Sequence, residues 1–315
     1  MAFTATVDEL LFETLEAFKL SLFPINQIGT EFKSATAKKD DTIKAHILGI
    51  PSTSTYNAST GFLNGAAEAE TMFTDVPVTL DQMPTVPIKI DYLTQLGSKV
   101  DLGKATTNMG YALAKAVLGN ILTKVTVANF TYAATAVDAA NFNLDELEEV
   151  RTKLNTNGAM QMGRWGVLNS AAAQYLGTDS RVASSDFYNQ TSGGPRGFRQ
   201  WTGVAGFDKI WEYPDMPTNS EKLQGFFADP RAIVFASRPI DVNTPAQQFG
   251  ATQVNRFNQV TDPETGLTLT AVTWEAAGTA DAYMVLSILY GVSAGTQGGS
   301  ANALTDKAGV RLVTT

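Results

Sequence analysis

The feature that most constrains this chain is a long polar tract between two strand-like segments within residues 42–91. On the returning side, Val76, Val78 and Leu80 alternate with other residues, which is the two-residue period of a half-buried strand. The tract between the two sides has neither this period nor a helical one. The pattern predicts a long two-stranded arm with a polar tip of about 25 residues.

An isolated two-stranded arm is only marginally stable in water. We therefore expect this arm to place its tip on another subunit. The aromatic and apolar residues of the tract are the candidate contacts with that subunit: Tyr56, Phe62, Leu63 and Phe73. Pro77 and Pro87 favour edge strands or irregular pairing in the flanking segments, because proline has no N–H to give to a strand ladder.

The first segment predicts an amphipathic helix that ends at Pro24, since the residue before a proline avoids the helical conformation. Its apolar residues recur three and four positions apart and form one stripe: Val7, Leu11, Leu15, Phe18 and Leu22. The stripe must be buried, either on the chain's own body or on a neighbouring subunit. Our hypothesis is the neighbour, with Leu11, Leu15 and Phe18 at the interface.

Periodicity and capping residues predict the remaining elements. The expected helices are residues 101–125 with Asp101 as N-cap, a helix capped by Asn143, a helix from Asn169 through Leu176 that Gly177 ends, and a helix opened by Asp229-Pro230 that runs to about Ala236. The expected strands are 165–168, 204–211, 225–228, 282–292 and 310–313, and residues 251–275 predict a hairpin.

Charge argues against sequence-specific binding to DNA. The net charge is −8, and the nearest approach to a basic run, Lys38-Lys39, is followed at once by Asp40-Asp41. Proteins that grip nucleic acid need clustered lysine and arginine, because phosphate neutralisation supplies most of the affinity. Charged residues make up only 17% of the chain, which leaves a neutral polar surface that is cheaply desolvated by a neighbour.

The residues for a catalytic, cofactor or metal site are missing. There is no cysteine and one histidine, His46, whereas a zinc site usually needs at least two such ligands. Neither a phosphate-binding loop nor the dinucleotide glycine pattern occurs. The spacing of the carboxylates Glu146, Glu148 and Glu149 with Arg151 and Lys153 fits a solvated helix face. We therefore expect that the chain is not an enzyme and that it binds neither a cofactor nor a metal.

The sequence also lacks the signals of a membrane or secreted protein. The longest apolar run, residues 284–292, is far shorter than the roughly 20 residues that a membrane helix needs. The leading apolar stretch carries Asp8, Glu9, Glu13 and Glu16, unlike a secretory signal. We expect no membrane partner.

The order of these elements resembles the Hong Kong 97-type capsid fold of tailed-phage and herpesvirus shells. The segments that carry the resemblance are the "G-x-x-G, strand, short loop, x-x-P" stretch of residues 203–217 and the stretch of residues 228–239, which ends in Ala236-Ser237-Arg238-Pro239. The resemblance implies an α+β fold with an N-terminal arm (1–41), an extended loop (42–91), a peripheral domain (92–200) with a spine helix (101–125), an axial domain (201–292), and a C-terminal strand (293–315) returning to the peripheral domain.

This resemblance implies a major capsid protein that forms the hexamers and pentamers of an icosahedral shell. A scaffolding protein, a portal protein and packaged DNA bound without sequence specificity are the implied partners. Some members crosslink through a lysine near the loop tip, but residues 45–88 contain no lysine, so we expect no such crosslink. The arm starts at residue 1, so we expect a separate scaffolding protein or earlier removal of a prodomain.

Other structural proteins remain as alternatives. A tube or decoration protein of a virion is disfavoured by the long predicted helix, since tube proteins are mostly built of strands. A surface-layer protein is disfavoured because the sequence has no secretion signal.

Overall fold

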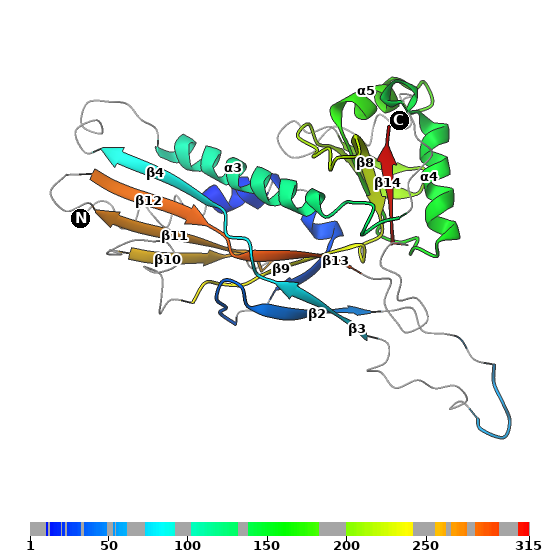
Figure 1. Cartoon of the computed structure of the whole chain (residues 1–315), viewed down its shortest axis with the longest axis horizontal. Helices are drawn as coiled ribbons and strands as arrows, with labels where there is room; N and C mark the ends of the chain where they lie inside the picture. Colours follow the sequence, from blue (N-terminus) through cyan, green and yellow to red (C-terminus); the bar gives the residue numbers. More distant parts are fainter. Residues whose placement is uncertain are drawn as a thin grey trace.

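One long helix and four β-sheets organise the described part of the chain, which is a computed structural model (Figure 1). The structure describes residues 11, 13–19, 21–22, 24–32, 35–48, 53, 55–61, 73–91, 102–131, 138–182, 200–241, 256–262, 266–275, 281–295 and 308–314. The expected N-cap Asp101 and residues 263–265 in the turn of the predicted hairpin lie outside these residues.

The long helix, α3, covers one face of a four-stranded antiparallel sheet (Figure 1). Its residues are Leu102–Thr123, which confirms the expected helix. The strands of the sheet, in order, are β10 (Arg256–Thr261), β11 (Thr268–Glu275), β12 (Asp281–Ser287) and β4 (Thr85–Asp91). Met109 of α3 packs on Ala271 and Leu286 of the sheet. The hairpin predicted for residues 251–275 is thereby confirmed as β10 and β11.

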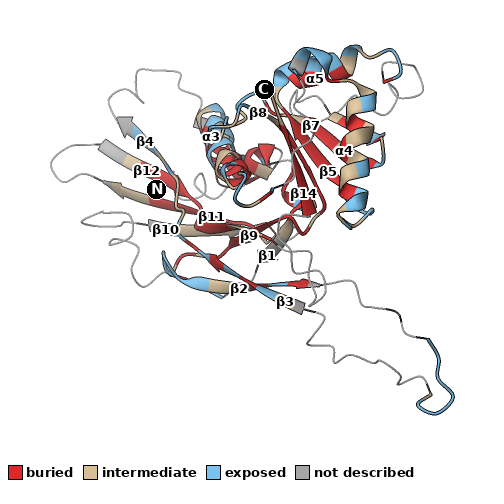
Figure 2. Cartoon of the chain, turned by 45° about the vertical axis from the view of Figure 1, so that its right-hand side comes forward, coloured by how far each residue is buried: buried red, intermediate tan, exposed pale blue. Residues whose placement is uncertain are grey.

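A five-stranded sheet forms the other end of the molecule with two shorter helices (Figure 2). Its strands, in order, are β14 (Gly309–Val313), β8 (Leu223–Ala228), β5 (Trp165–Leu168), β7 (Phe207–Glu212) and β6 (Gln200–Val204). The helices are α4 (Leu144–Thr156) and α5 (Ser170–Thr178). β5 lies before residue 200, and its partners β7 and β8 lie after it. The sheet therefore gives no support to the domain boundary expected between residues 200 and 201.

Two smaller sheets connect these parts. The three-stranded sheet has the order β1 (Gly29–Phe32), β9 (Ile233–Ser237) and β13 (Tyr290–Ala294). The two-stranded sheet is β2 (Thr42–Leu48) paired with β3 (Phe73–Thr79). Short 3-10 turns occupy Ile25–Gln27 and Ala139–Asn141.

Both expected asparagine caps are present. Asn143 accepts hydrogen bonds from the backbone N–H groups of Asp145 and Glu146, and Asn169 accepts one from that of Ala172. These side chains satisfy N–H groups that have no partner within the helix. The helix α5 continues through Gly177 to Thr178, two residues beyond the expected end at Leu176.

The helix predicted for residues 229–236 is wrong. This segment turns at Asp229 and then forms β9, whose five residues are all buried. The strand lies between β1 and β13, so both of its faces and both of its edges are covered. The sequence of a fully covered apolar run fits a buried strand as well as a buried helix. The elements that pack against the run determine which of the two forms.

Two predicted strands are each divided in two. The strand expected at 204–211 is a hairpin of β6 and β7, because Ala205 and Gly206 both have positive φ and form a tight turn. The strand expected at 282–292 breaks at Ile288 and Leu289, where the chain passes from the four-stranded to the three-stranded sheet. The strands expected at 165–168, 225–228 and 310–313 are confirmed.

The C-terminal half of α3 is fastened to the five-stranded sheet by polar contacts. Asn219 donates to the carbonyl oxygens of Leu122 and Val125 at 2.9 and 2.6 Å, and so caps the end of the helix. Tyr213, just after β7, donates to the carbonyl of Lys115 at 3.4 Å. These bonds fix the orientation of α3 against that sheet.

A buried ion pair holds the turn that precedes β9. Asp229 is fully buried, and its carboxylate accepts from Arg231 Nη2 at 2.6 Å and from the backbone N–H of Met160 at 3.0 Å. The backbone N–H of Arg231 also donates to it, at 2.8 Å. The carboxylate therefore ties the loop after α4 to the start of β9.

We expect Asp229→Asn to lower the free energy of unfolding by about 3–5 kcal/mol, because the buried Arg231 guanidinium then faces an uncharged amide. Chemical denaturation of the unassembled subunit measures the loss. The matched control is Asp215→Asn, which removes a half-exposed carboxylate that binds Lys115 at 2.9 Å and should cost far less. Equal losses in the two variants would contradict the structural role of Asp229.

Candidate functional site

The two-stranded sheet is the base of a projecting structure that we call the ribbon, residues 42–79. One face of the base is packed on the body: Ala45, Ile47, Val76 and Val78 are buried. Their partners include Val234 and Ala236 of β9 and Leu289. In the part of the chain that the structure describes, β2 and β3 pair with each other alone.

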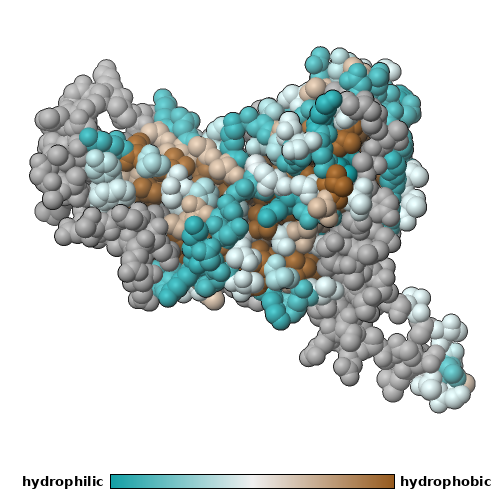
Figure 3. Space-filling model, viewed as in Figure 1, coloured by the Kyte–Doolittle hydropathy of each residue, from teal (hydrophilic) through white to brown (hydrophobic). Residues whose placement is uncertain are grey.

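The described residues of the ribbon tip lie away from the body of the subunit (Figure 1). Tyr56 has 62% of its surface exposed, and residues 57–60 are all exposed. The backbone N–H of Gly61 donates to the carbonyl of Asn57 at 2.7 Å and closes a turn there. Figure 3 shows mostly pale side chains at the tip, neither strongly hydrophilic nor strongly hydrophobic.

The four candidate contacts on the ribbon differ in how much of each the structure describes. Tyr56 is exposed, as a contact with a second molecule requires. Phe62 and Leu63 lie outside the described residues. Phe73 begins β3 opposite Leu48, and its side chain is outside the described part. The role of all four in a subunit interface stays a prediction.

The candidate contacts of the leading helix are placed differently from the expectation. Residues 11–21 are helical where described, but Leu11, Leu15 and Phe18 are buried in the chain's own core. Leu15 and Phe18 share a cluster with α3, and Leu11 packs with Met109 and the four-stranded sheet. A contact with a neighbour through these side chains requires the helix to leave this core.

Two close contacts explain why the leading helix docks on its own chain. A Cβ atom at Gly110 of α3 would lie 2.6 Å from the carbonyl oxygen of Thr14, so glycine permits the two helices to approach. Lys19 binds the buried carboxylate of Asp262 at 3.2 Å, beside the end of β10. The periodicity of the helix predicts its apolar stripe but does not identify which surface covers it.

The outer face of the ribbon base carries the single histidine. His46 Nδ1 lies 2.7 Å from Asp75 Oδ1 across the two strands, and Lys44 Nζ lies 3.3 Å from Asp75 Oδ2. The hydrogen bonds from His46 and Lys44 lower the pKa of the exposed Asp75 carboxyl. The group is a surface charge cluster across the two strands of the ribbon base.

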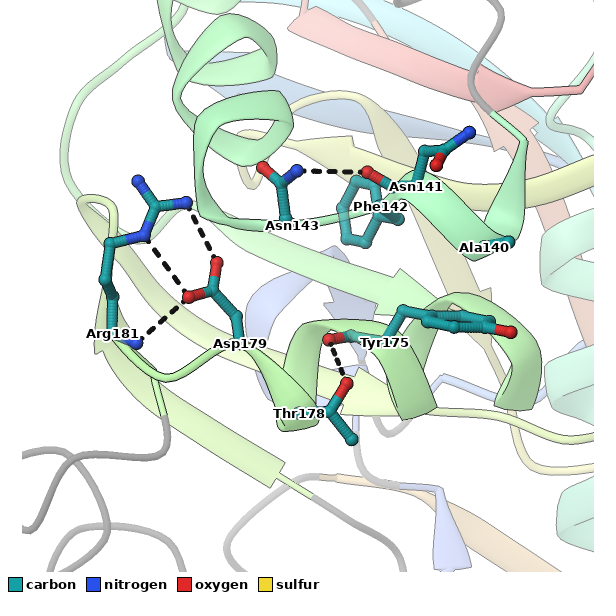
Figure 4. A pocket seen from close by; sticks show the side chains of 8 residues that line it. All are labelled: Ala140, Asn141, Phe142, Asn143, Tyr175, Thr178, Asp179 and Arg181. Atoms are coloured by element: carbon teal, nitrogen blue, oxygen red, sulfur yellow. Dashed lines mark hydrogen bonds and ion pairs between the residues drawn. The ribbon is translucent and has the colours of Figure 1, made fainter.

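A shallow polar pocket of about 330 Å³ lies between the start of α4 and the end of α5 (Figure 4). Arg181 binds both Asp145 and Asp179 there, at 2.6 and 2.9 Å. The hydrogen bonds from Arg181 are the main cause that lowers the pKa of Asp179 to about 2, and the backbone N–H of Leu144 adds to the effect. All charged groups of the pocket are engaged with one another.

No reactive cluster appears in the described ranges. They contain no group of three or more histidine, aspartate or glutamate residues placed to hold a metal ion. The carboxylates of α4 are paired on its surface, Glu148 with Arg151 and Glu149 with Lys153. Among the described helices, none combines the length and the apolar character that a membrane span requires.

Known structures share this architecture over almost its full length. A structure described as the capsid of the cyanophage P-SCSP1u matches 92% of this chain and 86% of its own, with a TM-score of 0.52 and 14% identity. A structure from Microbacterium phage Oxtober96 matches 93% and 91%, with a TM-score of 0.53 and 10% identity. A virus-like particle from Pyrococcus furiosus matches 97% and 98%, with a TM-score of 0.50 and 8% identity.

The chain has the Hong Kong 97-type capsid fold. The α+β class expected from the sequence is thereby confirmed. The individual domain boundaries and the role of α3 as a spine helix stay predictions. No protein-family model matches the sequence, and no curated protein is similar to it.

We expect Phe18→Ala to lower the free energy of unfolding by about 3–5 kcal/mol, because it leaves a cavity beside α3. Tyr56→Ala, at an exposed position, should change it by about 0.5 kcal/mol or less. Denaturation of both unassembled variants separates a core residue from a surface residue. If Phe18→Ala has no effect on stability, the leading helix is not docked on its own subunit in solution.

The pKa of Asp179 predicts an acid-dependent loss of stability. Because its pKa is about 2 in the folded chain against an ordinary 3.8, the carboxylate stabilises the fold above pH 4. That contribution is lost as the pH falls from about 4 to 2. We expect Asp179→Asn to be less stable than wild type at pH 7 and to lose less stability over the acid range. Parallel curves in a denaturation series against pH would contradict this.

Proposed function

We propose that this chain is the major capsid protein of a tailed bacteriophage, and that its copies assemble into the icosahedral shell that encloses the double-stranded DNA. The observation that carries the proposal is the capsid fold over 92% of the chain, combined with a ribbon whose exposed tip leaves the subunit. A monomeric protein gains nothing from such a ribbon, since a two-stranded structure is only marginally stable alone.

In the proposed shell, each ribbon lies on a neighbouring subunit of a hexamer or pentamer. Tyr56 supplies a large aromatic surface, and the uncharged residues 57–60 cost less free energy to desolvate than charged residues would. Every contact is weak, but a subunit in a closed shell makes several of them at once. Simultaneous contacts raise the effective affinity by orders of magnitude, while single misplaced subunits still dissociate.

We assign no catalytic activity and no cofactor to the chain. A scaffolding protein and a portal protein are the proposed partners in assembly, and packaged DNA is enclosed without sequence-specific binding. The proposed locations are the host cytoplasm during assembly and the virion capsid afterwards. A hydrolase activity that disappears on substitution of a single carboxylate would contradict the structural role.

Other virion subunits and surface-layer proteins are the alternative. Two of the structural neighbours are a phage capsid and a virus-like particle, which favours a closed shell over a tube or a surface layer. Negative-stain electron microscopy of the protein expressed with its scaffolding protein tests the choice. Uniform closed shells support the proposal, and a monodisperse monomer at high concentration contradicts it.

Deletion of residues 52–66 should spare folding of the subunit and abolish shell formation. The deletion removes the ribbon tip but keeps β2 and β3, whose buried face belongs to the body. Circular dichroism and the unfolding midpoint report on folding, and electron microscopy reports on assembly. If the shortened chain unfolds, the tip belongs to the core. If it still forms shells, the ribbon is not the essential contact.

A further inference from the structure

Three elements of the fold meet at one side chain, that of Asn120 on α3. The segment 80–84 links the ribbon to β4, and Gln82 within it exchanges two backbone hydrogen bonds of 3.0 Å with Tyr290 at the start of β13. The Asn120 amide donates to Gln82 Oε1 at 2.9 Å and to Tyr290 Oη at 2.8 Å. The Asn120 amide therefore joins the ribbon link and the three-stranded sheet to the long helix.

The groups that Asn120 binds are themselves firmly held. Tyr290 has no exposed surface, and its ring stacks on Phe235 of β9 with centroids 5.3 Å apart. This burial raises the pKa of Tyr290 to about 12, so its hydroxyl stays neutral. The next residue, Gly291, has the backbone of Thr79 so close that any Cβ would collide with it. The end of the ribbon thus sits against β13 with no free space.

The base of the ribbon is also held by its buried face, which packs on β9 and Leu289. Its sheet has one buried face, and its two strands pair with each other alone in the described part of the chain. Leu80 exchanges backbone hydrogen bonds with Asp40 and Asp41, which closes the base. In the described residues, Asn120 and Gln82 form a side-chain hydrogen bond that joins α3 to this link.

We infer that Asn120 is a positioning residue that fixes the direction of the ribbon relative to α3. The ribbon in turn meets a second copy of the chain, so its direction sets the angle between neighbouring subunits. This last step rests on the proposed function. Asn120 belongs to α3 and binds the ribbon link, so a displacement of α3 moves the ribbon. The angle between neighbouring subunits then changes, and the curvature of the shell changes with it.

Hydrogen exchange in the unassembled subunit tests the positioning role directly. In Asn120→Ala we expect the amides of β2 and β3 to exchange about tenfold faster, since two hydrogen bonds at the base are lost. The strands β5 and β8 should exchange as in wild type. Gln82→Ala removes one of the two acceptors without altering the helix, and should give a smaller increase at the same two strands.

Asn108→Ala is the matched control, because it makes the same substitution on the exposed face of the same helix. It should leave exchange in the ribbon unchanged. Unchanged ribbon exchange in Asn120→Ala overturns the inference, and so does faster exchange spread over all the sheets, which indicates a merely structural role.

Shell diameters measured by electron microscopy test the link to assembly. Asn120→Ala and Gln82→Ala should give a broader distribution of diameters than wild type and Asn108→Ala. Uniform shells from variants with a loosened ribbon overturn the effect on curvature. If wild type forms no shells, the proposed function is rejected, and hydrogen exchange alone then decides whether Asn120 positions the ribbon.

Discussion

The packing of one face of α3 against both larger sheets is the constraint on which the rest of the structure depends. Leu113, Val117 and Ile121 of this helix belong to one continuous core. The same core contains Trp211 and Phe226 of the five-stranded sheet, Leu269 of the four-stranded sheet, and Phe18 of the leading helix. Because close-packed interiors transmit small displacements, the two ends of the molecule and the leading helix respond together to any movement of α3.

Local sequence patterns predicted the elements whose signals are local. The period of α3, the caps at Asn143 and Asn169, and the hairpin of β10 and β11 need only neighbouring residues to be recognised. The segment after Asp229 shows the limit, because its proline and apolar run fit the start of a helix as well as a buried strand. Its partners β1 and β13 decide for a strand, and they come from residues far away in the chain.

The same limit applies to the candidate site. The exposure of Tyr56 followed from its place in an aperiodic polar tract, whereas the stripe of the leading helix could not identify the surface that covers it. Gly110 was the available signal, since a glycine inside a helix often marks a close approach of another backbone. Asn120 gave no signal at all, because its partners lie 38 and 170 positions away along the chain.

The docked leading helix and the exposed ribbon together suit reversible assembly. Complete burial of a large apolar side chain is worth about 1.5–3 kcal/mol, so three such residues contributed to a neighbour would add roughly 5–9 kcal/mol to each contact. Contacts that strong would trap misplaced subunits. With Leu11, Leu15 and Phe18 buried in their own chain, that free energy stabilises the subunit instead. In the shell that we propose, the contact with a second copy is then left to a ribbon of low charge, whose weak attachment permits a wrongly placed subunit to leave.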